Sequence, residues 1–207
     1  MQAPEDVRRY LERLANELQT VLRSRLRGLY ALGGLALGDY RPGRSDIDVY
    51  GVVDEPLDDE RKLAVAEACR HRTIPCPARK LELVIVSAGV AAAPGSAPDW
   101  ELNLNTGAAE PDHIGLNPAA EARHWFVIDL AIAHQHGLRL FGPAAPELIG
   151  APDPAVIQAA QSQAIVWFAR HGRESDAAAT ACRAWFWHET GTFTTKRQAI
   201  RWAAQRL

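Results

Sequence analysis

The spacing of apolar residues along the chain predicts one long helix followed by several short strands. In residues 5–27, apolar side chains recur every three or four positions, the pattern of an amphipathic helix, with Pro4 before it and Gly28 after it. Apolar or alternating runs bounded by turns predict strands at residues 29–32, 46–53, 81–86 and 100–105. A charged segment at residues 58–71 predicts a second helix, and the Ala-, Gly-, Pro- and Ser-rich residues 88–98 are expected to form a loop.

The pattern becomes helical from about Ala119 onward. It predicts helices at residues 119–136, 143–148, 154–170, 176–190 and 195–206, interrupted by a short piece at residues 138–141. Because the strands precede most of the helices, the sequence predicts an α+β fold in which a domain of sheet and helices leads into an α-helical domain. We expect these domains to span residues 1–150 and 151–207.

Composition and charge narrow the possible partners. The 207 residues are 47% hydrophobic and 23% charged, as is typical of a soluble globular protein. No apolar run approaches the roughly 18–20 residues that span a bilayer, and the first residues show no signal-peptide pattern, so we expect a cytoplasmic protein without membrane contact. The 23 basic and 25 acidic residues give a net charge of −2, whereas a nucleic-acid-binding surface normally brings a basic excess. Nucleic acid is therefore not an expected partner, and no oligomeric state is predicted.

Two aspartates stand out on the second predicted strand. Asp46 and Asp48 are two residues apart, so their side chains leave the same face of the strand, about 7 Å apart at the Cα atoms. Carboxylates that approach each other on a buried face repel and require a cation, and hard oxygen ligands favour Mg²⁺ or Mn²⁺. The alternative interpretation is a solvated strand end in which Ser45 is a turn residue.

Glu82 is the single charged residue of the run at residues 81–86, and it shares a strand face with Val84 and Val86. A carboxylate on an apolar face is rarely buried without a partner. If this strand lies beside the aspartate strand, three carboxylates converge, and the third could ligate a metal or accept a proton. The alternative is a charge on an edge strand that discourages further pairing of the sheet.

The pair Gly33-Gly34 follows the first predicted strand. Glycines at such a position let backbone N–H groups approach an anion that larger side chains would exclude. The spacing fits neither a Rossmann fingerprint nor a Walker loop. Twelve residues then separate Gly33 from Asp46, and a simple turn remains an alternative.

Together these features resemble the signature of the nucleotidyltransferase superfamily, which is a Gly-Ser or Gly-Gly pair ending a strand, a variable turn, and Asp-hydrophobic-Asp on the next strand. Most of residues 25–207 also resemble the aminoglycoside adenylyltransferases of the streptomycin/spectinomycin type. The resemblance implies a nucleotidyltransferase domain with a mixed sheet flanked by helices, followed by an α-helical bundle that is short relative to the family. The segments that carry it are residues 81–86, 128–132, 140–145, 182–186, 190–191, 195–196 and 199–203.

The resemblance implies transfer of AMP from ATP to a hydroxyl of an aminoglycoside-like acceptor, with pyrophosphate leaving, a reaction that confers antibiotic resistance. Asp46 and Asp48 match the Mg²⁺ ligands of the family, and Glu82 matches the general base that activates the acceptor hydroxyl. Such a transfer depends on positioning and charge neutralisation. The residues expected to bind ATP are Gly33, Gly34, Ser45, Arg183 and Lys196.

Two other functions remain open from the sequence. A non-catalytic nucleotide-binding or regulatory module could keep this fold, and it is suggested by Gly34 in place of the usual serine and by the short helical part. An enzyme that transfers the nucleotide to a protein side chain is a third possibility.

Overall fold

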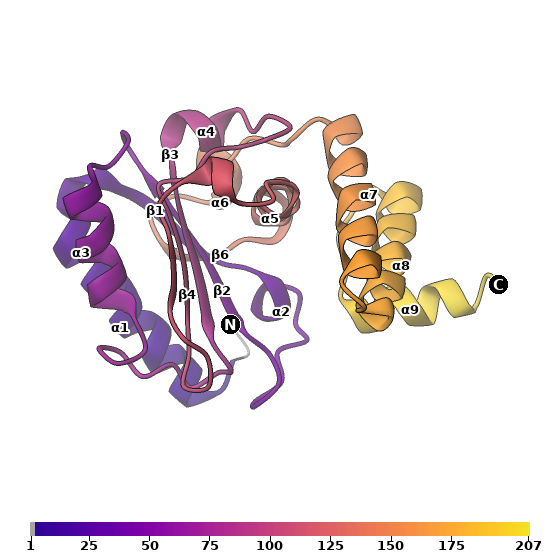
Figure 1. Cartoon of the computed structure of the whole chain (residues 1–207), viewed down its shortest axis with the longest axis horizontal. Coiled ribbons are helices and arrows are strands. Elements are labelled where there is room, and N and C mark those ends of the chain that lie inside the picture. The colour runs from indigo at the N-terminus through magenta and orange to yellow at the C-terminus, as the bar shows by residue number, and fades with distance from the viewer. Residues whose placement is uncertain (1–2) are drawn as a thin grey trace.

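A six-stranded mixed sheet forms the centre of the first part of the chain in the computed structural model, which describes residues 3–207 (Figure 1). The strands lie in the order β5-β4-β3-β2-β1-β6. The central pair, β2 and β3, is parallel, and the other neighbouring pairs are antiparallel. Their bounds are β1 Leu26–Ala31, β2 Ile47–Val53, β3 Leu81–Ser87, β4 Leu102–Thr106, β5 His113–Gly115 and β6 Leu138–Phe141.

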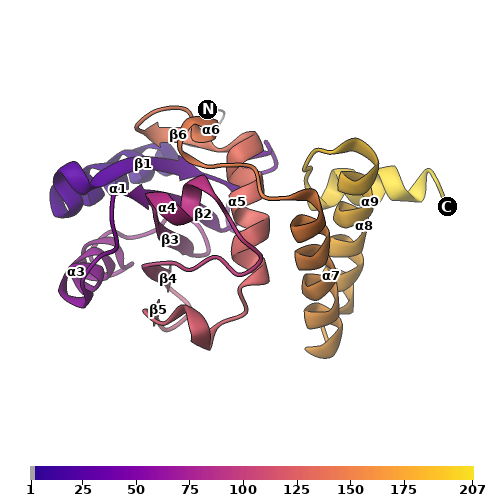
Figure 2. The same ribbon diagram turned by 90° about the horizontal axis from the view of Figure 1, so that it is seen from above.

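Helices cover both faces of this sheet. α1 and α3 pack on one face, against strand residues such as Val49 and Leu83, which are fully buried. α5 covers the opposite face, with α4 and α6 beside it (Figure 1, Figure 2). Because strand side chains alternate between faces, every second residue of β2 and β3 points toward α5. The bounds are α1 Glu5–Leu22, α3 Asp59–Cys69, α4 Ala88–Ala92, α5 His124–His136 and α6 Ala145–Leu148.

α5 connects the sheet to the last three helices because it has two apolar sides. Phe126, Leu130 and Ala133 pack on the sheet, whereas Val127 and Ala131 pack against α7, α8 and the turn that follows α8. Figure 2 shows α5 between the sheet and these C-terminal helices. The bounds are α7 Pro154–Arg170, α8 Glu174–Thr190 and α9 Lys196–Ala204; the short helices are α2 Gly33–Ala36, η1 Arg23–Arg25 and η2 Pro118–Ala120.

The predicted α+β class is confirmed, and several local predictions need correction. Residues 88–98 do not form a loop throughout, because the Ser87 hydroxyl accepts a hydrogen bond from Val90 N and caps the short helix α4. The piece at residues 138–141 is a strand, β6, which pairs with the edge of β1. The helix expected from Ala119 begins at His124, after the single turn η2. The division into domains at about residue 150 stays a prediction.

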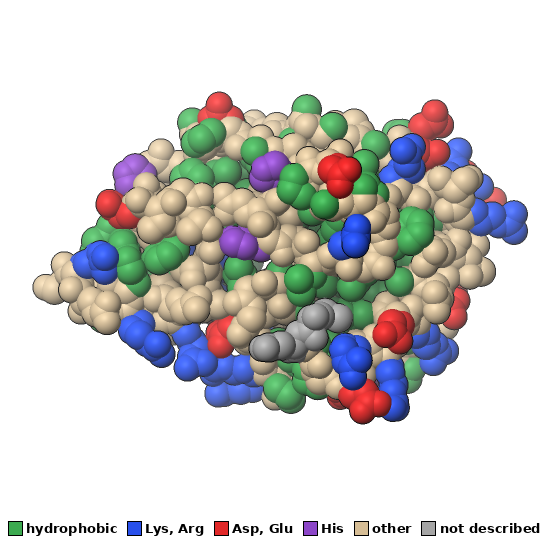
Figure 3. Space-filling view, turned by 180° about the vertical axis from the view of Figure 1, so that it is seen from behind, with side chains coloured by type: hydrophobic (Ala, Val, Ile, Leu, Met, Phe, Trp, Pro, Cys, Tyr) green, Lys and Arg blue, Asp and Glu red, His purple; other side chains and the backbone are tan. Residues whose placement is uncertain are grey.

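The rear face of the molecule carries charges of both signs. Figure 3 shows acidic and hydrophobic side chains spread over this face and several basic side chains grouped along its lower left edge. Within residues 3–207, no helix has both the length and the apolar character needed to cross a membrane.

Candidate active site

Asp48 and Glu82 lie directly opposite each other on the two central strands. The parallel register of β2 and β3 pairs Asp48 with Glu82 and Tyr50 with Val84, so both carboxylates face α5. β3 lies between β2 and β4, which excludes the interpretation of Glu82 as an edge-strand charge. The sheet therefore brings two acids from distant parts of the sequence onto one face.

Gly33 makes room for the Asp48 side chain. The backbone of Gly33 has a φ of +54°, and a Cβ at this position would overlap Asp48 Oδ2. The segment is also tied to β2, because Leu32 N donates to Asp48 O at 2.8 Å. Gly34 follows at the start of α2, where its backbone lies near Tyr40. Gly33 thus allows close approach to a carboxylate of its own chain.

A third carboxylate, Asp129, reaches the same place from α5. Its Oδ2 accepts a hydrogen bond from the Tyr50 hydroxyl at 3.2 Å. Burial and the charge of Glu82 raise the pKa of Asp129 to about 7, although the Tyr50 hydroxyl and Arg183 partly offset this. Burial also raises the pKa of Asp48 well above its usual range, and the charges of Glu82 and Asp129 raise it further. The surroundings of Asp48 and Asp129 therefore disfavour ionisation of both carboxyl groups when no cation is bound.

The Asp46 carboxylate, unlike that of Asp48, is paired with an arginine. Arg79 donates to its two carboxylate oxygens, with Nε to Oδ1 at 2.8 Å and Nη2 to Oδ2 at 2.6 Å. These hydrogen bonds raise the pKa of Arg79. Ser45, one residue earlier, accepts a hydrogen bond from Arg41 N through its hydroxyl at 3.0 Å, as a turn residue does.

The helical region contributes two cations. Burial lowers the pKa of Arg183 on α8, although the nearby charges of Asp129 and Asp48 favour its protonated form. Its Nε is buried and has no hydrogen-bond partner among the described residues. Lys196, the first residue of α9, is half exposed, and its Nζ lies 2.9 Å from Asp176 Oδ1.

Two cavities meet at this group of charges. The glycine-side cavity, of about 440 Å³, includes Gly33, Gly34, Ser45, Arg183 and Thr195 in its lining. The aromatic-side cavity, of about 500 Å³, includes Asn103, Asn105, Trp125, Trp167 and Phe168. Both cavities are lined by Asp46, Asp48, Arg79, Glu82, Asp129 and Lys196. Molecules bound in the two cavities would therefore be neighbours at these shared residues.

The donor chemistry fits a divalent cation, but the described side chains do not form a finished metal site. Within residues 3–207, no group of three or more His, Cys, Asp and Glu side chains is arranged to bind a metal. Asp46 is engaged by Arg79, whereas the Asp48 carboxylate faces like charges that a cation would neutralise. Asp46 and Asp48 are the residues that could hold Mg²⁺ in this cavity.

Several residues of the site were missed by sequence reasoning. Asp129 lies within an apolar helical run, and a lone acid among apolar residues was an available signal. Arg79, Lys80 and the pair Asn103/Asn105 carried no recognisable motif. Asn103 and Asn105 join the site because the sheet places β4 beside β3, and Arg79 and Lys80 join it because they directly precede β3.

The comparisons with known proteins identify the fold. No protein-family profile matches the sequence, and no curated protein shows significant sequence similarity to it. Among solved structures, the chain is similar to spectinomycin adenyltransferase AAD(9) from Enterococcus faecialis, whose crystal structure was determined with ATP and spectinomycin. The match has a TM-score of 0.74 and 20% sequence identity, and covers 97% of this chain and 84% of that chain. The chain therefore has an aminoglycoside nucleotidyltransferase-like fold.

Proposed function

We propose that the protein is an ATP- and Mg²⁺-dependent nucleotidyltransferase that moves AMP onto a hydroxyl of a small, aminoglycoside-like acceptor. The observation that carries this proposal is the meeting of two cavities at the carboxylates of Asp48 and Glu82. A two-substrate transfer requires a nucleotide and an acceptor on either side of the reacting groups. The AAD(9) structure, determined with ATP and spectinomycin, supports these two classes of ligand.

In this proposal the glycine-side cavity takes ATP. Mg²⁺ would supply charge neutralisation at the phosphates, held by Asp48 and by Asp46 once Arg79 releases it. The Arg183 guanidinium, with its unpaired Nε, and the Lys196 ammonium would bind phosphate oxygens. Gly33, Gly34 and Ser45 would line the path of the nucleotide without blocking it.

The aromatic-side cavity takes the acceptor. Glu82 lies at its border with the glycine-side cavity, so its carboxylate could accept the proton of an acceptor hydroxyl. The deprotonated oxygen would then attack the α-phosphorus of ATP, forming a new P–O bond as the bond to pyrophosphate breaks. The Asn103 and Asn105 carboxamides and the Trp125 and Trp167 rings offer polar and stacking contacts of the kind that bind sugar-like molecules.

The direct test is pyrophosphate release from ATP and Mg²⁺ in the presence of a panel of aminoglycosides and aminocyclitols. We expect release that depends on both the acceptor and Mg²⁺, together with an acceptor product heavier by one AMP group. Release with none of the acceptors, while ATP still binds, would instead identify a non-catalytic nucleotide-binding module. Labelling of proteins rather than small molecules would identify the third function considered from the sequence.

A further inference from the structure

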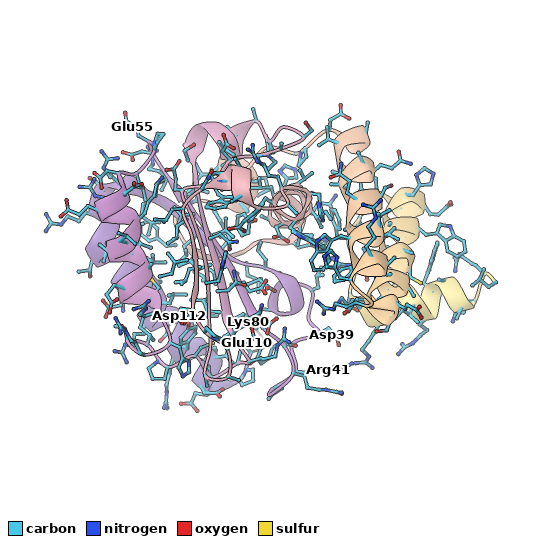
Figure 4. All side chains as sticks on the ribbon, viewed as in Figure 1. Asp39, Arg41, Glu55, Lys80, Glu110 and Asp112 are labelled. Atoms are coloured by element: carbon cyan, nitrogen blue, oxygen red, sulfur yellow. The ribbon has the colours of Figure 1, made fainter. Side chains whose placement is uncertain are left out.

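Lys80 lies beside the candidate base, and the function proposed above gives it no role. It precedes Glu82 by two residues, so strand alternation places both side chains on the α5 face. Its Nζ lies 2.7 Å from Glu82 Oε1 and donates to Asn105 Oδ1 at 3.3 Å. Figure 4 labels Lys80 at the end of the sheet. Its side chain is 16% exposed, against 38% for Glu82, so Lys80 is the more enclosed side chain of the pair.

A row of polar contacts continues from Lys80 across the sheet. Asn105 Nδ2 donates to Asn103 Oδ1 at 3.1 Å, and Asn103 Nδ2 donates to Glu121 Oε2 at 2.6 Å. Glu121 Oε1 in turn lies 3.0 Å from His113 Nε2. Each amide has its oxygen on one neighbour and its nitrogen on the next, so the orientation of Asn105 toward Lys80 is fixed.

The stem of Lys80 is confined as well. Gly107 packs so closely that a Cβ there would lie 3.0 Å from Lys80 Cβ and 2.5 Å from Arg79 O. The backbone is also fixed, since Lys80 O accepts a hydrogen bond from Ile47 N at 2.9 Å. Lys80 is therefore held at its stem by packing and at its tip by two oxygen acceptors.

The position of Glu82 explains why its carboxylate needs a partner that restrains it. Its neighbour across the strands is Asp48, and a cation bound at Asp48 would also attract the Glu82 carboxylate. We propose that Lys80 is a positioning residue that binds Glu82 Oε1 and keeps this carboxylate available to the acceptor hydroxyl rather than to the cation. Asn105, fixed by Asn103 and Glu121, holds Lys80 in place. This inference rests on the proposed function, in which Glu82 is the base.

The test is a thermodynamic cycle of Mn²⁺ binding, measured by electron paramagnetic resonance without nucleotide. Lys80→Met should tighten Mn²⁺ binding about tenfold, equivalent to about 1.4 kcal/mol, because Glu82 becomes free to join Asp48. In the Glu82→Gln background, Lys80→Met should have no further effect. The matched control is Lys62→Met, since Lys62 is 14% exposed, pairs with Glu101 at 3.5 Å and lies outside both cavity linings; its Mn²⁺ affinity should stay unchanged.

A kinetic arm uses the same variants. Lys80→Met should lower kcat about tenfold with the KM for ATP unchanged, and Lys80→Arg should restore part of the loss. Asn105→Ala should change Mn²⁺ affinity and kcat in the same directions by smaller factors, and it gives a milder variant should Lys80→Met fold poorly.

The outcomes distinguish this inference from the proposed function. If Lys80→Met tightens Mn²⁺ binding only when Glu82 is present, and the wild-type protein has no transferase activity, then Lys80 does keep Glu82 from the cation, and it is the proposed function that is rejected. Mn²⁺ affinity that is unchanged in Lys80→Met and Asn105→Ala overturns the role of Lys80. If Lys80→Met tightens Mn²⁺ binding equally in the Glu82→Gln background, the role of Lys80 is also overturned, because the effect would then come from a general loss of positive charge. Absence of Mn²⁺ binding in all variants overturns it too.

Discussion

The two walls of the glycine-side cavity are built in different ways. On the sheet side, the acids come from paired strands, and Asp48 is fixed both by its register with Glu82 and by the bond from Leu32 N. On the helical side, the cations come from α8 and α9. α8 packs against α5 through Trp187, and α9 packs on α8, with Trp202 against Trp185. The acidic wall therefore forms with the sheet, whereas the basic wall depends on how the helices dock.

The two cations also differ from each other. Arg183 is partly buried near Asp129 and Asp48, with its Nε fully covered, whereas Lys196 is 50% exposed and pairs with Asp176 of its own helical region. An ion pair between Arg197 and Asp39, at 3.1 Å, joins α9 to the turn after α2 (Asp39 is labelled in Figure 4). Arg183 is thus already positioned in the cavity, whereas Lys196 must leave Asp176 before it can bind a phosphate group.

The largest effect should come from the acidic wall. Glu82→Gln removes the proton acceptor with little change in shape, so we expect kcat to fall by about 10²- to 10⁴-fold with ATP affinity retained. Pre-steady-state measurement of pyrophosphate release, alongside calorimetric titration of ATP, would separate the two quantities. Equal rates for Glu82→Gln and wild type would remove Glu82 from the chemistry.

Substitutions of the two cations of the basic wall, Arg183 and Lys196, should weaken ATP binding by different amounts. Arg183→Met should weaken ATP binding about 10- to 100-fold, because an enclosed charged hydrogen bond is lost. Lys196→Met should weaken it by about threefold or less, since an exposed ammonium must first leave Asp176. Calorimetric titration of ATP with both variants checks this order, and a larger loss for Lys196→Met would contradict the difference between the two cations.

Gly33, which accommodates Asp48, can be compared with Gly38 in a matched pair of substitutions. Gly33→Ala combines a positive φ with overlap on Asp48 Oδ2, whereas Gly38 has a similar φ of +72° and nothing within 4 Å of an added Cβ. We expect Gly38→Ala to cost about 1 kcal/mol of unfolding free energy and Gly33→Ala about 2–3 kcal/mol. Urea unfolding measures both, and equal losses would show that the space near Asp48 plays no part.

Asp129 and Asp176 should contribute to the pH dependence of stability with opposite signs. The raised pKa of Asp129, about 7, means that the folded state binds its proton more tightly than the unfolded chain. Ionisation of Asp129 therefore destabilises the folded protein, on the order of 1 kcal/mol or more, as pH rises from about 4 to 7. Hydrogen bonding to Lys196 lowers the pKa of Asp176, so its contribution is present at neutral pH and lost as pH falls below about 4.

Two substitutions isolate these contributions in metal-free buffer. Asp129→Asn should become more stable relative to wild type as pH rises toward 7, and Asp176→Asn should be destabilising at pH 7 and nearly neutral below pH 4. Thermal unfolding across this pH range provides the measurement. Parallel curves for Asp129→Asn and wild type would show that Asp129 titrates normally.

The sequence predicted the acidic wall better than the basic wall for a physical reason. Strand alternation alone indicated the faces of Asp48 and Glu82, and one correct assumption, that their strands are neighbours, brought them together. The surroundings of Arg183 and Lys196 depend on helix docking, which no local pattern specifies, and their assignment came from the family resemblance. Periodicity also missed α4 and β6. α4 is stabilised by the Ser87 side-chain cap, and β6 by pairing with the distant strand β1, and neither interaction leaves a periodic pattern in so short a segment.

The central claim is that strand carboxylates bind the nucleotide through a divalent cation. The most direct measurement is calorimetric titration of ATP into wild type and Asp48→Asn, each with Mg²⁺ and with EDTA. We predict that Mg²⁺ strengthens ATP binding at least tenfold in wild type and has little effect in Asp48→Asn. The same gain from Mg²⁺ in both proteins, or none in wild type, would contradict the account.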